Sequence, residues 1–254
     1  MKNYLVFLKK EFVESLRNYK FLILLVLFIM FGVSNPVMAK LLPKMLGSMD
    51  MQGMTIVIPE PSALDSWTQF YKNMSQMQII ILVIVFSGTI ATELSKGTLV
   101  NILTKGVSRT SVVLAKFTSI SLVWTACYWL CFGITTVLTG ILLPSGGLTS
   151  LVFSAFGLWI FGIMIISVLI LFNCLTGNIF ASLLGTGGFA VTLSLLSMIA
   201  KIKDYIPTIL STANLQIIQG ELKPMEFVPA TVIACGVTIV SIISAISIFR
   251  KKQL

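Results

Sequence analysis

Histidines, cysteines and paired carboxylates carry most chemistry inside proteins, and this sequence of 254 residues offers few of them. It contains no histidine and only four cysteines. Cys127 and Cys131 are four residues apart, which puts them on one face of a helix, but no histidine or acid stands near them in the sequence. We interpret both as packing residues. We therefore expect no catalytic residue, no metal site and no cofactor bound by this chain.

The segment ELSKGTLVNILTKGVSR, residues 93–109, is the other place where residue types and spacing suggest a function. Gly97 can end a preceding helix and Thr98 can cap a new one, so we predict a short helix over about 97–106. Leu99, Ile102 and Leu103 would form a narrow apolar face on it. The pattern suits docking to a partner, and a solvated loop that only fixes topology is the alternative that these residues leave open.

The composition indicates where this segment must sit. Hydrophobic residues make up 56% of the chain, charged residues only 11%, and the mean hydropathy is +0.98. A soluble domain carries roughly 25% charged residues, so there is too little polar surface here for a water-soluble globule. The sequence predicts a single membrane-embedded domain over 1–254.

Long apolar runs predict six transmembrane helices in an all-α integral membrane protein. No charged residue occurs from 117 to 200, a stretch that holds three crossings, and no segment shows the alternation typical of a membrane barrel. The predicted spans are about 21–39, 73–92, 117–143, 148–172, 179–200 and 228–249.

The charges predict the orientation. Six spans put both termini on the same side, where twelve lysines and arginines face three acids, whereas the other side balances six cations against six acids. Basic residues gather on the cytoplasmic side of membrane proteins. We therefore place both termini and the 93–109 segment in the cytoplasm. The net charge of +9 then follows from topology, and no nucleic-acid partner is implied.

Helical patterns also occur outside the spans. Residues 4–19 predict an amphipathic helix in the membrane surface, with an apolar face of Leu5, Leu8, Phe12, Leu16 and Tyr19. The outer segments 40–72 and 201–227 predict short helices. Ser62 with Asp65 would cap the first of these, and Ser211 the second.

The run ATELSKGTLVNILTKGVSRTSVVLAKF resembles the signature region of the ABC type-2 permeases. The matching residues are Glu93, Gly97-Thr98, Leu103, Ser108-Arg109 and Lys116, and the chain departs from the pattern at Gly106-Val107, where the family often has proline. The surface helix, the six spans and the helices between spans five and six extend the resemblance over nearly the whole chain.

The resemblance implies that the 93–109 segment is a coupling helix docked on a separate cytoplasmic ATPase subunit, which would bind ATP and Mg. No G-x-x-x-x-G-K-[ST] phosphate loop occurs in this chain, as expected for a permease that is not itself an enzyme. The residues assigned to coupling are Glu93, Lys96, Gly97, Thr98, Leu99, Ile102, Leu103 and Arg109.

The resemblance further implies a second permease copy or relative, in a bacterial cell membrane. Ala181, Gly185 and Gly188 allow close helix packing in span five, and Ser182 and Thr186 lie on a neighbouring face. We expect these five residues at the dimer interface or along the substrate path, with packing inside one chain as the alternative. The cargo would be apolar or amphipathic, an antimicrobial or toxin peptide first and a lipid second.

Two other classes of protein remain. An ion-coupled secondary transporter or channel would need no ATPase, but such proteins usually hold buried ionisable groups, and the predicted span cores contain no histidine or acid. An intramembrane enzyme would need a nucleophile with its base or a ligand cluster, and neither is visible.

Overall fold

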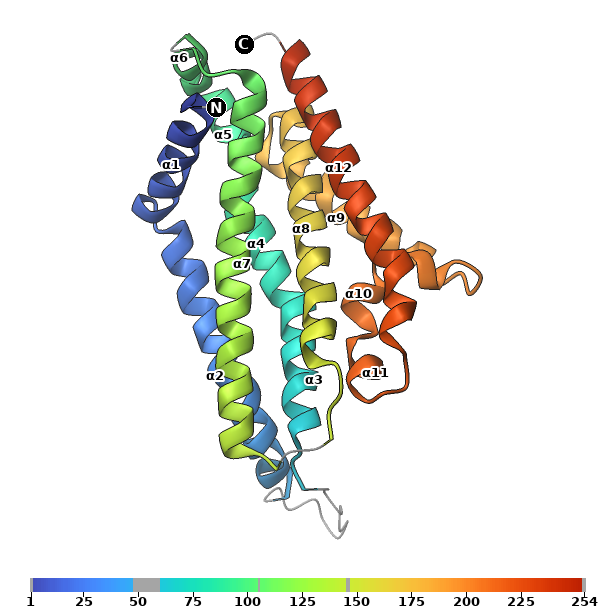
Figure 1. Cartoon of the computed structure of the whole chain (residues 1–254). Helices are drawn as coiled ribbons and strands as arrows, with labels where there is room; N and C mark the ends of the chain where they lie inside the picture. The colour runs from blue at the N-terminus through green and yellow to red at the C-terminus, as the bar shows by residue number, and fades with distance from the viewer. Residues whose placement is uncertain (1, 48–59, 105, 145–146, 253–254) are drawn as a thin grey trace.

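The computed structural model describes residues 2–47, 60–104, 106–144 and 147–252, and these residues form helices and their connections without any strand (Figure 1). Within them, six helices are long and apolar enough to cross a membrane. The predicted all-α membrane fold with six spans is therefore confirmed.

The helices follow one another as a chain of long spans with short helices at the ends. They are α1 (Lys2–Arg17), α2 (Lys20–Gly47), α3 (Ala63–Asn73), the π-helical turn η1 (Met74–Gln78), α4 (Ile79–Phe86), α5 (Ala91–Ser95), α6 (Thr98–Thr104), α7 (Arg109–Leu142), α8 (Leu151–Thr176), α9 (Ile179–Leu196), η2 (Lys203–Tyr205), α10 (Ile209–Thr212), α11 (Asn214–Ile218), η3 (Pro224–Phe227) and α12 (Val228–Lys251).

The second span is longer than the sequence suggested, because the helix expected outside the membrane is continuous with it. The stretch Ala63–Ser95 runs as one candidate span through α3, η1, α4 and α5. Ser62 begins it as predicted, with its backbone N–H and its hydroxyl both donating to Asp65 Oδ2 at 2.8 and 2.9 Å. No proline or glycine interrupts the helix before Gly88, so nothing separates the two predicted pieces.

The aromatic residues of α3 face the protein. Trp67 and Phe70 are buried, and their rings lie 5.2 and 5.9 Å from the ring of Phe132 on α7. Aromatic pairs at such distances stabilise a helix contact beyond the area that they bury. The start of the second span is therefore fastened to α7.

Two other spans extend past their predicted ends. The helix α2 continues through Pro36 and Pro43 to Gly47, and α7 begins at Arg109 instead of 117. Ser108 caps α7 by accepting a hydrogen bond from the Ser111 amide at 3.1 Å. The predictions stopped at charged residues, but a helix can carry them beyond the apolar layer. Residues 48–59 of the outer segment 40–72 lie outside the described part.

The central helix is α8, which is the most buried of the six spans and packs against α7, α9 and α12, while α9 is the least buried. Its neighbours are fixed by hydrogen bonds to its backbone. Tyr128 of α7 donates to the Ala155 carbonyl at 2.6 Å, and Trp124 donates to the Trp159 carbonyl at 3.1 Å. Buried side chains that satisfy their polar atoms in this way hold a specific helix register.

Among the short helices between α9 and α12, the cap that was expected at Ser211 does not form. Ser211 lies inside α10 and donates to the Thr208 carbonyl at 2.8 Å, so it does not cap the next helix. The helix α11 begins at Asn214, whose side chain is buried and accepts a hydrogen bond from Ser154 of α8 at 3.0 Å. This contact fastens the outer segment to the central helix.

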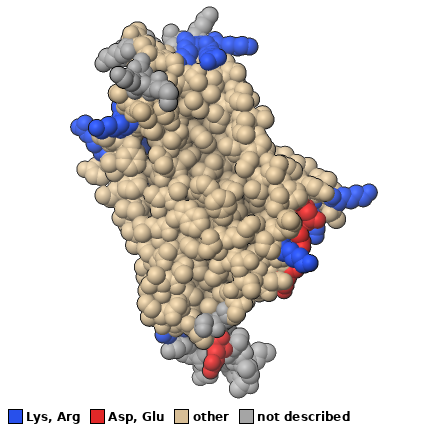
Figure 2. Space-filling model, in the orientation of Figure 1, with Lys and Arg blue, Asp and Glu red and all other residues tan. Residues whose placement is uncertain are grey.

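Both termini lie at the same end of the molecule, together with α6 (Figure 1). We call this end the termini end. Lysine and arginine side chains gather there, and a broad surface without charged residues separates them from a mixed group of both signs (Figure 2). This arrangement fits a molecule whose middle layer lies in lipid.

Candidate functional site

The predicted coupling segment forms a helix–turn–helix at the termini end. Gly97 has a φ of 66° between α5 and α6, a conformation that favours glycine and ends α5 where expected. Thr98 is the first residue of α6, and its hydroxyl donates back to the Glu93 carbonyl at 3.3 Å. Lys96 and Thr98 are exposed. The sequence thus located a real short helix, and the structure bounds it at Thr98–Thr104.

The apolar face of α6 is not open to a partner in the way that the sequence suggested. Leu99 is completely buried in the chain's own core, and Ile102 and Leu103 are half-buried against that core. The expectation that the chain leaves this face uncovered is wrong for Leu99. Leu99 anchors α6 to the bundle, and Ile102 and Leu103 keep part of their surface free.

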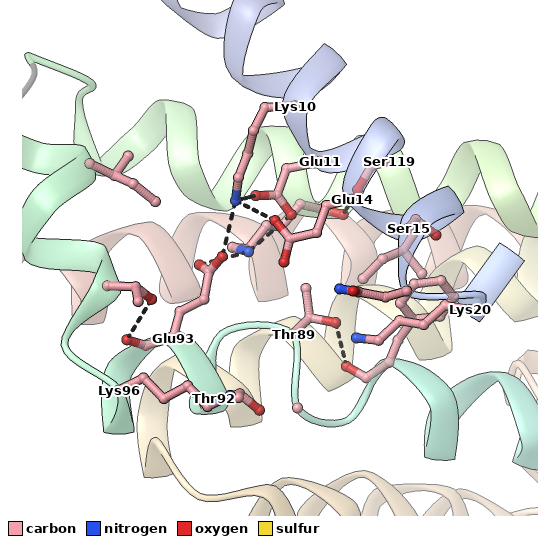
Figure 3. Close-up of a pocket in the computed structure, with 17 residues that line it drawn as sticks. Lys10, Glu11, Glu14, Ser15, Lys20, Thr89, Thr92, Glu93, Lys96 and Ser119 are labelled. Atoms are coloured by element: carbon pink, nitrogen blue, oxygen red, sulfur yellow. Dashed lines mark hydrogen bonds and ion pairs between the residues drawn. The ribbon is translucent and has the colours of Figure 1, made fainter.

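Glu93 lies at the centre of an ion-pair cluster that joins α1, α5 and α7. Its carboxylate is 2.8 Å from the Lys116 ammonium and 3.2 Å from that of Lys10. Lys116 also lies 3.0 Å from Glu11, and Lys10 lies 2.6 Å from Glu14. We call these five residues the Glu93 cluster, and Figure 3 shows Lys10 between the three carboxylates.

The cluster is stabilised by the mutual neutralisation of buried charges. Lys116 is 1% exposed and Glu11 is 6% exposed, and the ion pair between them offsets the cost of removing both side chains from water. Burial opposes the charge on Lys10, but the hydrogen bond to Glu14 and the attraction of Glu11 and Glu93 outweigh it and raise the pKa of Lys10. Burial likewise acts against the Glu14 carboxylate, and the Lys10 hydrogen bond outweighs it and lowers the pKa of Glu14.

The three carboxylates approach one another as closely as metal ligands do, with one oxygen from each of Glu11, Glu14 and Glu93 within 4.8 Å of the others. The positive charge that such a group requires is supplied by Lys10 and Lys116, which lie in contact with these oxygens. The arrangement therefore suits a structural ion-pair network, and it gives no reason to assign a metal.

Sequence reasoning missed this cluster because it considered only one face of α1. The outward residues Leu5, Phe12, Leu16 and Tyr19 are exposed, as an apolar face toward lipid would be. The opposite face packs on the protein, where Phe7, Glu11 and Ser15 are buried and Tyr4 donates to Thr118 at 3.0 Å. The signal was present in the spacing of residues 7, 11 and 15, which puts them on one stripe of the helix.

Arg109 has a different environment from the one expected of a residue that orients the coupling loop. Its Nη1 lies 3.0, 2.7 and 2.6 Å from the carbonyl oxygens of Phe249, Arg250 and Lys252. These carbonyls at the end of α12 have no partner within the helix, and a cation there satisfies them. Arg109 thus joins the first turn of α7 to the last turn of α12.

Two of the small residues of α9, Gly185 and Ser182, make close contacts within the chain. A Cβ on Gly185 would lie 2.3 Å from the ring of Phe172 on α8, so this glycine permits a close contact between α8 and α9. Ser182 is buried, and its hydroxyl donates to the Asn178 carbonyl at 2.7 Å. Ala181 is half-buried, whereas Gly188 is exposed with open space where a Cβ would stand.

Thr186 lines a groove of about 540 Å³ between α4, α8, α9 and the outer helix α10. Its walls are mostly apolar, with Ile80, Ile84 and Phe161 among them, and hydroxyls such as that of Ser75 interrupt them. Ser182 is not one of the residues that line this groove. Of the five residues expected along a dimer interface or substrate path, Thr186 is the one that lines this groove.

Comparison with known proteins bears on the whole chain. No curated protein matches it. The protein-family model described as ABC-2 family transporter protein matches residues 5–254, which includes all six spans and the α5–α6 segment. A match of this extent agrees with the resemblance drawn from residues 93–116. The chain therefore belongs to the ABC-2 family of transporter proteins, as a transmembrane permease.

Proposed function

We propose that this protein is the permease subunit of an ATP-driven exporter, coupled to a separate ATPase subunit through α6. The observation that carries the proposal is the position of α6 at the termini end, directly after Glu93 and its ion pairs to α1 and α7. A partner that moves α6 would act through Glu93 on two further helices. A topological loop would need no such connection.

The surface left for the ATPase is smaller than the sequence suggested. Its described part includes the exposed Lys96 and Thr98 and the free parts of Ile102 and Leu103. Leu99 contributes indirectly, because it holds the helix in place. The termini end is the cytoplasmic side in this proposal, in agreement with its excess of basic residues.

The groove and the weakly packed α9 support a path formed with a second copy or a relative. Phe180, Leu184 and Leu195 of α9 are 76%, 77% and 62% exposed, and they would face lipid or another subunit. An apolar groove interrupted by hydroxyls suits an apolar or amphipathic cargo, with a peptide as the first candidate and a lipid as the second. ATP and Mg would be bound by the partner subunit.

The test is co-purification of the ATPase encoded with this permease, followed by measurement of its hydrolysis rate in reconstituted vesicles. Replacing both Ile102 and Leu103 by serine should weaken the association by about tenfold or more, since fully burying each side chain is worth roughly 1.5–3 kcal/mol and each is already partly covered. Lys251→Gln, an exposed cation at the same end, is the matched control.

Leu99→Ser separates docking from folding, because Leu99 is completely buried and its loss should lower the thermal stability of the permease alone more than the double variant does at its half-buried positions. Equal association and equal stimulation of hydrolysis for the double variant and the parent would refute coupling through α6. Transport that follows an ion gradient and persists without ATP would instead support the ion-coupled alternative.

A further inference from the structure

A polar cavity of about 680 Å³ lies beside the Glu93 cluster, between α1, the start of α2, and the α5–α6 segment (Figure 3). Four lysines and three glutamates line it, so its walls carry one net positive charge. The three carboxylates are all occupied by Lys10 and Lys116. The Glu93 cluster thus keeps one net negative charge, and the remaining lysines, Lys20 and Lys96, carry two positive charges.

Lys20 is the residue of interest because its ammonium makes no hydrogen bond or ion pair with any described residue. It is half-buried at the first position of α2, with 5.8 Å between its ammonium and the ring centroid of Phe86. The carboxylates of the Glu93 cluster attract it without a direct ion pair. Figure 3 places Lys20 across the cavity from Lys96. A half-buried ammonium without a direct acceptor leaves a hydrogen bond unmade.

Two hydroxyls in the cavity wall likewise have no hydrogen-bond acceptor among the described residues. Ser15 is 8% exposed, and its oxygen has no hydrogen-bond partner among the described residues. Thr92 is half-buried and likewise makes no side-chain hydrogen bond there. Buried hydroxyls normally find partners. Together with Lys20, they form a wall of donors that would suit a ligand rich in acceptor oxygens and negatively charged.

The position of the cavity relative to the membrane indicates which kind of anion would bind there. Tyr19, at the corner between α1 and α2, has a φ of 58° and is exposed, and the outward side chains of Leu16, Leu22 and Ile23 flank the corner. Tyrosine beside apolar residues is typical of the depth at which lipid headgroups lie. The cavity therefore opens where a phosphate would lie above acyl chains running along α2.

We propose that this cavity binds the phosphate group of a membrane phospholipid, with Lys20, Ser15 and Thr92 as donors and Lys96 as a second cation. The acyl chains would lie against the exposed apolar face of α2, which includes Leu22, Ile23 and Val26. A lipid bound there would wedge between α1 and α5 and support the Glu93 cluster from the side. This site is separate from the groove at α9 and does not depend on what the protein exports.

The test is native mass spectrometry of the purified full-length chain in detergent, titrated with dioctanoyl phosphatidylglycerol. Lys20→Gln should weaken binding by about tenfold, which is the size expected for a hydrogen bond to a charged group, and Ser15→Ala by a few-fold. Lys20→Arg should keep the affinity, because it keeps the charge. Arg17→Gln is the matched control, since Arg17 is exposed and lies outside the cavity lining.

Three results would overturn the proposal. The first is equal lipid binding by Lys20→Gln and the parent, with Arg17→Gln also unchanged. The second is binding of dioctanoylglycerol, which lacks the phosphate, as tight as that of the phospholipid. The third is binding of glycerol 3-phosphate as tight as that of the phospholipid, which would assign the cavity to a soluble phosphate.

Discussion

Two polar clusters connect the second and third spans to different neighbours at different heights, and they use different chemistry. Near the termini end, the Glu93 cluster links α1, α5 and α7 with ions. Deeper in the bundle, Asn73 at the end of α3 donates to Asn35 of α2 at 2.8 Å, and Asn35 donates to Thr135 of α7 at 3.4 Å. Asn35 and Thr135 are 1% and 0% exposed.

The difference follows from where water can reach. The Glu93 cluster borders a cavity at the termini end, and Lys10 is 41% exposed, so part of the cost of these charges is met by solvent. The amide cluster lies between long apolar stretches, where an ion would cost much more than a neutral hydrogen bond. The chain therefore fastens α1, α5 and α7 with ions near the surface, and α2, α3 and α7 with neutral hydrogen bonds at depth.

The largest effect should come from Lys116→Met. Removing Lys116 leaves Glu11 and Glu93 with Lys10 as their remaining counter-ion, which Glu14 also shares. Breaking a buried ion pair typically costs about 3–5 kcal/mol. The thermal unfolding midpoint in detergent should fall markedly, while Lys251→Met, at an exposed cation, should leave it unchanged. A midpoint equal to that of the parent would show that the Glu93 cluster adds nothing to stability.

A smaller effect is expected when the deep cluster is broken by Asn73→Ala. The Asn35 oxygen then loses its donor, and hydrogen bonds between membrane helices are worth about 0.6 kcal/mol on average and at most about 1.7 kcal/mol. The same unfolding assay should show a small shift, with Thr192→Ala, an exposed hydroxyl, as the control. A loss as large as that of Lys116→Met would contradict the distinction between ions and amides.

The smallest effect is a difference in acid sensitivity. Because the pKa of Glu14 is lowered in the folded protein, its contribution to stability is present above the ordinary value near 4.5 and is lost as the pH falls through the lowered value. The raised pKa of Lys10 works in the opposite direction, so its contribution disappears only in strong alkali, above its ordinary value near 10.5. Between these limits both contributions are present.

The measurement is the unfolding midpoint of the parent, Glu14→Gln and Asn73→Ala at pH 7 and near pH 3.5. Acidification should reduce the difference between the parent and Glu14→Gln, because the parent loses an interaction that the variant lacks. The curve of Asn73→Ala should run parallel to that of the parent, since no titratable group lies in the deep cluster. Parallel curves for all three proteins would show that Glu14 does not contribute to the pH dependence of stability.

Much of the fold was predictable because it depends on local patterns. Continuous apolar runs located the six spans, Ser62 with Asp65 located the start of α3, and Gly97 located the turn before α6. The ends of the spans were less predictable. Helices such as α7 continue beyond the apolar layer, where propensity and packing decide the boundary and hydropathy does not.

The partners of individual side chains could not be read from the sequence, because they depend on which helices become neighbours. Glu93 and Arg109 were both assigned to the coupling loop. The structure pairs Glu93 with Lys10 and Lys116, and Arg109 with the end of α12. Gly185 was correctly interpreted as a position of close packing, but only the fold shows that the ring of Phe172 is what it accommodates.

The regular helical hydrogen bonding of the second span is interrupted around residues 87–91, between α4 and α5. The amides of Ile90 and Ala91 donate to the side chain of Asn173 on α8, both at 3.4 Å, instead of to carbonyls four residues earlier. A helix whose backbone hydrogen bonds are interrupted in this way transmits a rotation poorly along its own axis. A movement of α6 would therefore reach the central helix α8 through the Asn173 side chain, in addition to α1 and α7 through Glu93.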